Sequence, residues 1–325
     1  PLFRSWSLRL LTFHELRHDV LDDVVSTDQW VRSYRGGSVS VGGDFELLNN
    51  WQLDLELGWN PASLSDTETR GGPLMGVPPS VDVEAGLTTD PRRTLSVGPT
   101  VAFEDRLSGG GSTLELGMSV VFRPVPAVEL TMGPALDVRD DASQFVASTD
   151  AVPFEPTFGS RYVFADLEQT ELSMETRLSA ALTPDLSLQV FAQPLVSSAD
   201  FVAYKQLARP GSFSFLPFPE GEAVGTDGEV TCRSGATCVD DGRRLLDLDG
   251  DGSVDFSFPD RDFNLRSLRG NAVLRWEYRP GSTVFLVWQQ DRRGEAPVGD
   301  FDLSRDLDAL FAADVENTFI VKVSH

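Results

Sequence analysis

Apolar and polar residues alternate strictly along much of the chain. Between Trp51 and Trp59 every odd position is leucine or tryptophan, and the positions between them are polar or glycine. Further runs with this period are 112–122, 127–138, 186–193 and 271–278. Successive side chains of a β-strand point to opposite faces, so this pattern predicts strands with one apolar and one polar face.

The connections between these runs are of two kinds, which alternate along the chain. Short turns are expected at 49–50, 90–93, 123–126, 183–185 and 279–282. Longer polar segments are expected at 17–36, 61–78, 104–112, 139–160, 198–265 and 291–316. If 161–182 is one unusually long strand, every short turn falls on the same side. We therefore predict an all-β, up-and-down antiparallel transmembrane β-barrel with about twelve strands visible, as part of a larger barrel, and long extracellular loops.

The polar face of these strands carries many charged side chains. They are Asp54, Glu56, Asp82, Glu84, Glu115, Glu129, Asp137, Glu171, Glu175, Arg177, Arg275 and Glu277. Such charges cannot line a dry core without partners, but they can line a water-filled lumen. An acidic lumen would favour cations over anions.

The apolar face would then meet outer-membrane lipid. Aromatic residues near the strand ends, which suit the girdles of such barrels, are Trp51, Trp59, Phe103, Phe122, Trp276 and Tyr278. A soluble β-sandwich is the alternative, since its strands also alternate. Its strands are usually ~5–6 residues long, shorter than the runs seen here, so the alternation favours the barrel.

The composition narrows the range of partners. There are 50 Asp and Glu against 27 Lys and Arg, giving a net charge of −23 and a pI of about 4.4. This balance argues against nucleic acid, which needs a basic surface. The chain begins at Pro1, without a signal peptide. We interpret residues 1–325 as one N-terminally truncated barrel domain.

The stretch HELRH matches the H-E-x-x-H pattern of zinc metalloproteases. On a helix, His14 and His18 would share a face and hold Zn²⁺, and Glu15 would activate a bound water. This needs residues 10–25 to be helical, which their apolar spacing permits. No third ligand stands out in the sequence, so we interpret the match as a coincidence in a loop.

The long loop 198–265 contains a calcium-type motif, DLDGDGSVD. The candidate ligands of Ca²⁺, the one cofactor expected, are Asp247, Asp249, Asp251, Ser253 and Asp255. Gly252 supplies the sharp turn, but Phe258 replaces the usual glutamate at position 12. The alternative is an acidic, solvated turn without a metal.

The two cysteines, Cys232 and Cys238, lie in the same loop. Their short spacing within a Gly-, Ser- and Thr-rich stretch favours a local disulfide in an oxidising compartment. Two free thiols are the alternative. With the neighbouring acidic motif, the loop is expected to form a surface lid.

Three long stretches, 158–198, 263–290 and 299–324, with 71–79 and 92–103, resemble a bacterial family of unknown function. Its members are outer-membrane β-barrels that usually follow a family 9 type carbohydrate-binding domain. The resemblance implies an outer-membrane location and a glycan ligand bound through an N-terminal domain that this chain lacks. It implies no catalytic residues.

The function expected from these observations is that of a non-enzymatic pore or surface receptor linked to glycan binding or uptake. The alternative is a surface-anchored hydrolase, either a glycan hydrolase that uses lumen carboxylates or a zinc protease that uses HELRH. Glycosidases need paired carboxylates at set separations, and a sequence cannot show such separations.

Overall fold

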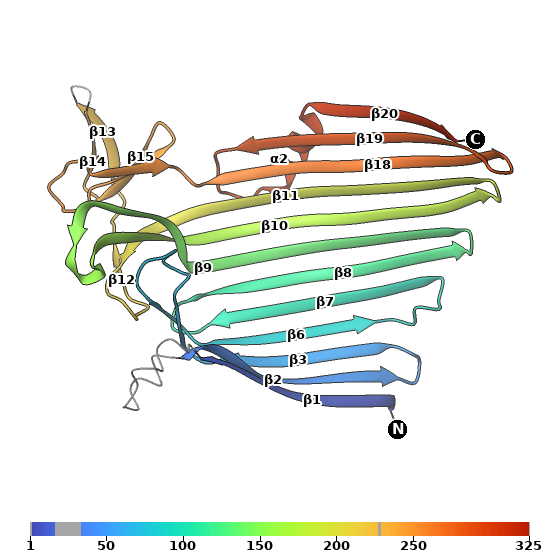
Figure 1. Cartoon of the computed structure of the whole chain (residues 1–325), viewed down its shortest axis with the longest axis horizontal. Coiled ribbons are helices and arrows are strands. Elements are labelled where there is room, and N and C mark those ends of the chain that lie inside the picture. Colours follow the sequence, from blue (N-terminus) through green and yellow to red (C-terminus); the bar gives the residue numbers. More distant parts are fainter. Residues whose placement is uncertain (1, 17–33, 227–228, 325) are drawn as a thin grey trace.

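The computed structural model describes residues 2–16, 34–226 and 229–324. A single antiparallel sheet dominates it (Figure 1). Twelve strands follow one another across this sheet in chain order. They are β1 (Phe3–Leu16), β2 (Tyr34–Leu47), β3 (Gln52–Asn60), β6 (Ser80–Thr88), β7 (Leu95–Arg106), β8 (Gly111–Val125), β9 (Val128–Phe154), β10 (Gly159–Thr183), β11 (Leu186–Leu207), β18 (Phe263–Arg279), β19 (Ser282–Ala296) and β20 (Val315–Ser324). The predicted all-β, up-and-down fold with about twelve strands is confirmed.

Smaller elements lie in the connections between the long strands. They are β4 (Ser63–Ser65), β5 (Met75–Val77), η2 (Glu155–Thr157), β12 (Phe215–Pro217), β13 (Glu222–Thr226), β14 (Glu229–Arg233), β15 (Thr237–Asp240), β16 (Arg243–Leu246), β17 (Phe256–Pro259) and α2 (Leu303–Ala312). Among the described residues, no helix is both long and apolar enough to cross a membrane.

The predicted short turns lie at one end of the sheet, and the long connections lie at the other end (Figure 1). The predicted longer segment 104–112 is an exception, because β7 and β8 extend into it and only residues 107–110 join them. The turn end also holds both ends of the chain (Figure 1). Within the part of the chain that the structure describes, β1 pairs only with β2 and β20 only with β19, so these two strands are the edges of the sheet.

Two further sequence expectations about local structure are wrong. Residues 139–160 were expected to be a polar loop, but β9 continues to Phe154 and β10 begins at Gly159. Cross-strand pairing, which the sequence does not display, extends both strands beyond the rest of the sheet. Residues 10–16 are not helical either, because they belong to β1 and pair with β2.

The buried apolar residues gather at the loop end, in a unit that we call the cap. The cap comprises residues 61–79, 139–165, 200–226 and 229–262. One of its clusters packs Val163 and Tyr204 against Leu246, Leu248 and Phe258. Another joins Met75, Phe164 and Leu207, with Phe213 and Phe215 against them. The cap therefore has a core of its own, formed around the extended ends of β9, β10 and β11.

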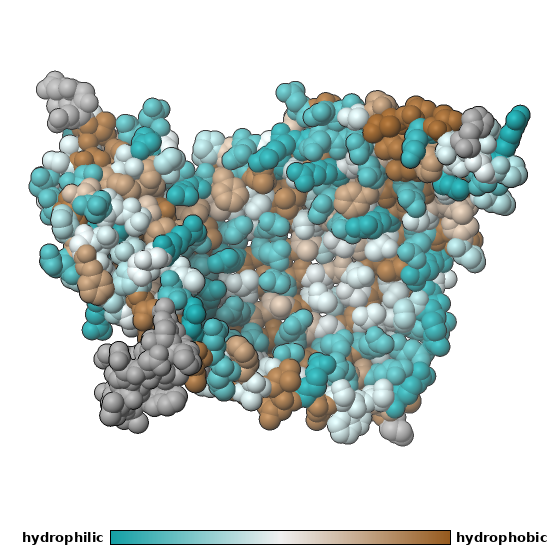
Figure 2. Space-filling view, viewed as in Figure 1, coloured by the Kyte–Doolittle hydropathy of each residue, from teal (hydrophilic) through white to brown (hydrophobic). Residues whose placement is uncertain are grey.

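The rest of the sheet is a single layer whose apolar side chains stay exposed. Leu57 is 57% exposed, Trp276 52% and Leu286 45%. Burying one such side chain contributes ~1.5–3 kcal/mol, so a soluble fold would cover this face. We call the side of the sheet that carries these residues the apolar face, and we call the opposite side the polar face. In the space-filling view of Figure 2, which shows one side of the molecule, hydrophilic and hydrophobic residues lie next to one another over the sheet.

Candidate functional site

Five carboxylates lie in one row on the polar face. The register places Glu56 opposite Glu84, and Glu84 opposite Ala102. Ala102 pairs with Glu115, Glu115 with Asp137, and Asp137 with Glu171. We call Glu56, Glu84, Glu115, Asp137 and Glu171 the acidic row. It crosses β3, β6, β7, β8, β9 and β10 and contains no basic side chain between its ends.

On the polar face, ion pairs lie mainly between the acidic row and either the turn end or the loop end of the sheet. Toward the turns, Arg123 pairs with Glu129 at 2.6 Å and Arg177 with Glu175 at 2.6 Å. Beyond the end of the row at β3, Arg9 lies 3.1 Å from Asp44. Among the described residues, no member of the acidic row forms an ion pair.

Like charges directly opposite each other on neighbouring strands are destabilising. The directly opposed pairs Glu56–Glu84, Glu115–Asp137 and Asp137–Glu171 therefore need water and mobile cations beside them, which a dry interface does not provide. A wall that carries such a row attracts cations and repels anions. The sequence shows that these carboxylates share a face, but their alignment depends on the register.

A cavity of about 250 Å³ opens at the loop end of the polar face. Asn60, Ser80, Glu104 and Arg106 line it, with Phe213 of the cap. Arg106 and Arg139 both approach the buried Asp141, at 3.5 Å and 2.6 Å. The cavity thus joins the cap to the polar face through side chains of both charges. No pattern in the sequence predicts it.

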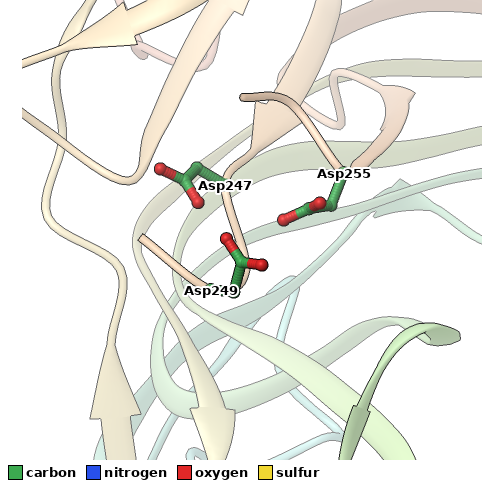
Figure 3. A group of neighbouring side chains, drawn as sticks. All are labelled: Asp247, Asp249 and Asp255. Atoms are coloured by element: carbon green, nitrogen blue, oxygen red, sulfur yellow. The ribbon is translucent and has the colours of Figure 1, made fainter. Parts of the chain in front are cut away.

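The calcium-type motif folds into a turn that gathers three carboxylates (Figure 3). Oxygens of Asp247, Asp249 and Asp255 all lie within 4.8 Å of one another. Asp247 accepts hydrogen bonds from the N–H groups of Gly250 (2.6 Å) and Gly252 (2.9 Å). These bonds hold the turn in the shape that cation-binding loops adopt.

The remaining predicted ligands are placed differently. Asp251 accepts a hydrogen bond from Ser253 N at 2.7 Å and is not part of the close group. Phe258, at position 12 of the motif, is buried in the cap core. Arg161 lies near enough to interact electrostatically with Asp255 and Asp249. Calcium binding stays a prediction, with three carboxylates rather than five side chains as its centre.

Calcium is expected to stabilise the cap with a Kd in the ~10⁻⁴–10⁻³ M range of extracellular sites. At a hundredfold excess over Kd the gain is about 2.7 kcal/mol. Calorimetric titration and melting of the cap would measure both values. Asp247→Asn should abolish the effect, whereas Asp240→Asn, elsewhere in the loop, should preserve it. Equal stabilisation of all three proteins would contradict the site.

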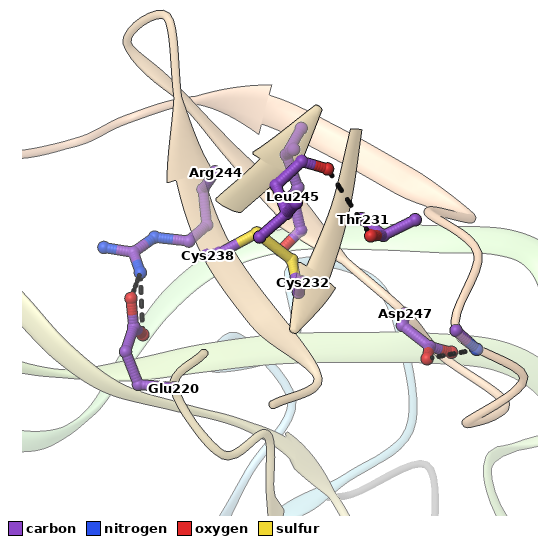
Figure 4. Close-up of a disulfide and its surroundings, with 9 residues drawn as sticks. Glu220, Thr231, Cys232, Cys238, Arg244, Leu245 and Asp247 are labelled. Atoms are coloured by element: carbon purple, nitrogen blue, oxygen red, sulfur yellow. Dashed lines mark hydrogen bonds and ion pairs between the residues drawn. A yellow bond between two sulfur atoms is a disulfide. The ribbon is translucent and has the colours of Figure 1, made fainter. Parts of the chain in front are cut away.

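The cysteines are joined in the structure, where Cys232 bonds to Cys238 (Figure 4). The bond links β14 to β15, and Leu245 packs against it. Beside it, Arg244 makes two hydrogen bonds to Glu220, at 2.7 Å and 2.8 Å. Closing a loop of this size stabilises a fold by roughly 2 kcal/mol, which helps a small cap with little core.

The HELRH stretch is only partly described. His14 lies in β1, and its Nε2 is 3.0 Å from Thr12 Oγ1. Its ring is on the apolar face, opposite Gly37 of β2. The helix that would place both histidines on one face does not form at His14, while His18 lies outside the described residues.

Asp262 joins the base of the cap to the sheet. Its Oδ1 accepts a hydrogen bond from Phe201 N at 2.9 Å, which links the segment before β18 to β11. Burial raises the pKa of Asp262 to about 6, and the neighbouring carboxylates of Asp260 and Asp200 act in the same direction. The hydrogen bond and Arg244 oppose this rise. Nothing in the sequence marks this residue.

The raised pKa predicts that the cap becomes more stable as the pH falls from ~7 to ~5. The folded state binds the Asp262 proton more tightly than the unfolded state, so this stabilisation is lost as the pH rises through about 6. Hydrogen exchange of β14–β16, corrected for intrinsic rates, would follow it.

Asp262→Asn should remove this pH dependence. Asp251→Asn is the matched control, because the bond from Ser253 N lowers the pKa of Asp251 and moves its titration below this window. An unchanged profile in Asp262→Asn would show that another group is responsible.

Comparison with known protein families finds one that matches most of the chain. Residues 22–325 match a family described as Domain of unknown function (DUF5916). The chain belongs to the DUF5916 family. No curated protein matches this DUF5916 chain.

Solved structures give only distant likenesses to the DUF5916 chain. A NanC porin structure in a rhombohedral crystal form is 9% identical, with a TM-score of 0.27, and the match covers 89% of this chain and 93% of that one. LpxR from Salmonella typhimurium is 10% identical, with a TM-score of 0.23, covering 89% and 88%. These scores are too low to carry an argument about function.

Proposed function

We propose that this chain forms the wall of a β-barrel in the bacterial outer membrane and that the wall lines a cation-favouring pore. The apolar face meets lipid, the polar face lines the water-filled lumen, and the cap stands on the extracellular side. In this arrangement the acidic row runs along the lumen wall beneath the cavity at the cap.

One observation carries the proposal above all. The twelve-stranded sheet is a single layer whose apolar side chains are exposed, while the buried clusters lie in the cap at its loop end. A soluble sandwich would place its core between two sheets. A membrane barrel instead turns its apolar band toward lipid and its charges toward the lumen.

Aromatic residues support the same orientation. Trp51 and Phe122 lie on the apolar face near the turn end of their strands, and Trp59 and Phe103 lie on that face near the loop end. They are 37–47% exposed. Two aromatic levels that bound an apolar band are typical of barrels in a bilayer.

A role in glycan binding and a hydrolase activity are two more specific functions to consider. A link to glycan binding or uptake rests on the family resemblance alone. For the hydrolase alternative, the described part of the chain offers no specific support, since His14 lies in a strand. Glu84 and Glu115 occupy β6 and β8, and no enclosed sugar site surrounds them among the described cavities.

The test uses the intact protein that contains this chain, taken from outer-membrane fractions. Closed barrels resist SDS, so the unboiled protein is expected to migrate faster in a gel than the boiled one. Release of the protein by a salt wash, together with identical mobility of both samples, would overturn the membrane proposal.

A further inference from the structure

The apolar face of β18 and β19 is bounded at the loop end by two arginines. On β18 this face runs from Trp276 to Leu268, and Arg266 follows; on β19 it runs from Val284 through Trp288 to Gln290, and Arg292 follows. No register shift interrupts β18 between Asn264 and Glu277. Nine residues of strand span roughly 25–30 Å, close to the ~25 Å apolar band of outer-membrane barrels once tilt is included.

Helix α2 lies over this boundary, against β18 and β19 (Figure 1). Asn264, on the same face as Arg266, donates to Asp306 Oδ2 at 2.9 Å and to the backbone oxygen of Asp300 at 3.2 Å. Arg292 donates to the backbone oxygen of Phe311 at 2.6 Å. The helix is therefore fixed on the face that we assign to lipid.

Among the described residues, none pairs with the charge of Arg266. Its side chain is on the face against which α2 packs, the residue is only 9% exposed, and its Nε is buried without a hydrogen-bond acceptor. The Nε of Arg292 is also buried and unpaired. The nearby carboxylate of Asp306 is bound by Arg305 at 2.9 Å and by Asn264. Within the described residues neither Arg266 nor Arg292 forms an ion pair.

A buried guanidinium without an anion costs several kcal/mol. The cost is unusual here, because the chain has a net charge of −23 and therefore an excess of carboxylates. Among the described residues, neither the buried Arg266 nor the partly exposed Arg292, which donates to the backbone oxygen of Phe311, has a carboxylate partner at the level where the apolar band ends. An anion from outside the chain would satisfy them, and guanidinium groups bind phosphate in a bidentate manner.

The exposed surface of α2 combines apolar side chains with the polar Ser304, Arg305 and Asp308. Phe311 is 61% exposed and Leu303 43%, and Val315 beyond the helix is 43% exposed. A short amphipathic helix with such a surface lies in the interface between lipid headgroups and acyl chains. A phospholipid would supply both acyl chains for Phe311 and a phosphate for Arg266.

We propose that Arg266 and Arg292, beneath α2, bind the phosphate headgroup of an outer-leaflet lipid. The site rests on the proposed membrane function. A lipid bound there would be held at one fixed position on the barrel, at the loop end of β18 and β19.

Native mass spectrometry of the intact protein would test the site, with phosphatidic acid and phosphatidylcholine of equal chain length as probes. The wild type is expected to retain phosphatidic acid ~10-fold better than phosphatidylcholine, in line with a charge-assisted hydrogen bond. Arg266→Gln should lower this retention at least ~5-fold, and Arg292→Gln serves as the second variant. Arg269→Gln is the control, because Arg269 faces the polar side and pairs with Asp291 at 3.6 Å.

Gel mobility distinguishes a failure of the lipid-site proposal from a failure of the proposed membrane function. A variant that keeps the heat-dependent shift and still retains phosphatidic acid overturns the lipid site but leaves the barrel intact. Loss of the shift in the wild type overturns the membrane function itself. Displacement of the lipid by millimolar inorganic phosphate would show a site for free anions and would overturn the lipid proposal.

Discussion

Replacing Leu116 with arginine is expected to destabilise the protein in a bilayer by about 2–4 kcal/mol, the cost of a charge at the midplane of a barrel. Leu116 is 40% exposed on the apolar face, between Leu114 and Met118 on β8. No lumen water can reach the new charge from that side. Urea unfolding in lipid vesicles would measure the change.

The neighbouring Glu115 provides a matched control on the same strand. Its side chain belongs to the acidic row, so Glu115→Arg places the same new side chain on the polar face. There it would meet water and opposite charges, and we expect little loss of stability. Equal destabilisation by both substitutions would mean that the two faces have similar surroundings, as in a soluble protein.

The second large effect concerns ion selectivity. Neutralising the acidic row through Glu56→Gln, Glu84→Gln, Glu115→Gln, Asp137→Asn and Glu171→Gln should lower the preference for K⁺ over Cl⁻ at least ~3-fold. The reason is that these carboxylates have no basic partners among the described residues, so their field acts on mobile ions. Reversal potentials across planar bilayers in a salt gradient would measure the ratio.

Glu129→Gln is the control for selectivity. Glu129 already pairs with Arg123 at 2.6 Å, near the turns, so its removal should change the ratio little. A neutralised row that leaves the ratio unchanged would contradict the assignment of this face to a conducting lumen. A folded barrel without any conductance would contradict the pore.

The cap and the sheet are stabilised by different means. In the cap, Tyr204 stacks near Phe258 at 5.9 Å between ring centroids, and Arg244 lies over the Tyr204 ring. Below the cap, stability comes from strand pairing, because the sheet has no second layer. Because of this division, we expect that calcium, if it binds the cap as predicted, and the titration of Asp262 leave the barrel unaffected.

The strands, their two faces and most of the alternation of short turns with long connections could be predicted from the sequence alone. These features are local. A period of two in Trp51–Trp59 assigns each side chain to a face, and turn residues such as Asn49 and Asn50 end the strands. The motif of residues 247–255 and the spacing of Cys232 and Cys238 were visible for the same reason.

The alignment of the strands with one another became visible only in the folded structure. A shift of the register by two residues would keep every face and still separate Glu84 from Glu56, so the acidic row could not be predicted. The extension of β9 through residues 139–154 also depends on pairing with β10. Likewise, α2 lies over Arg266 through contacts of Asn264 with residues far along the chain. Such contacts join distant segments, and hydrophobic periodicity reports only on neighbours in the sequence.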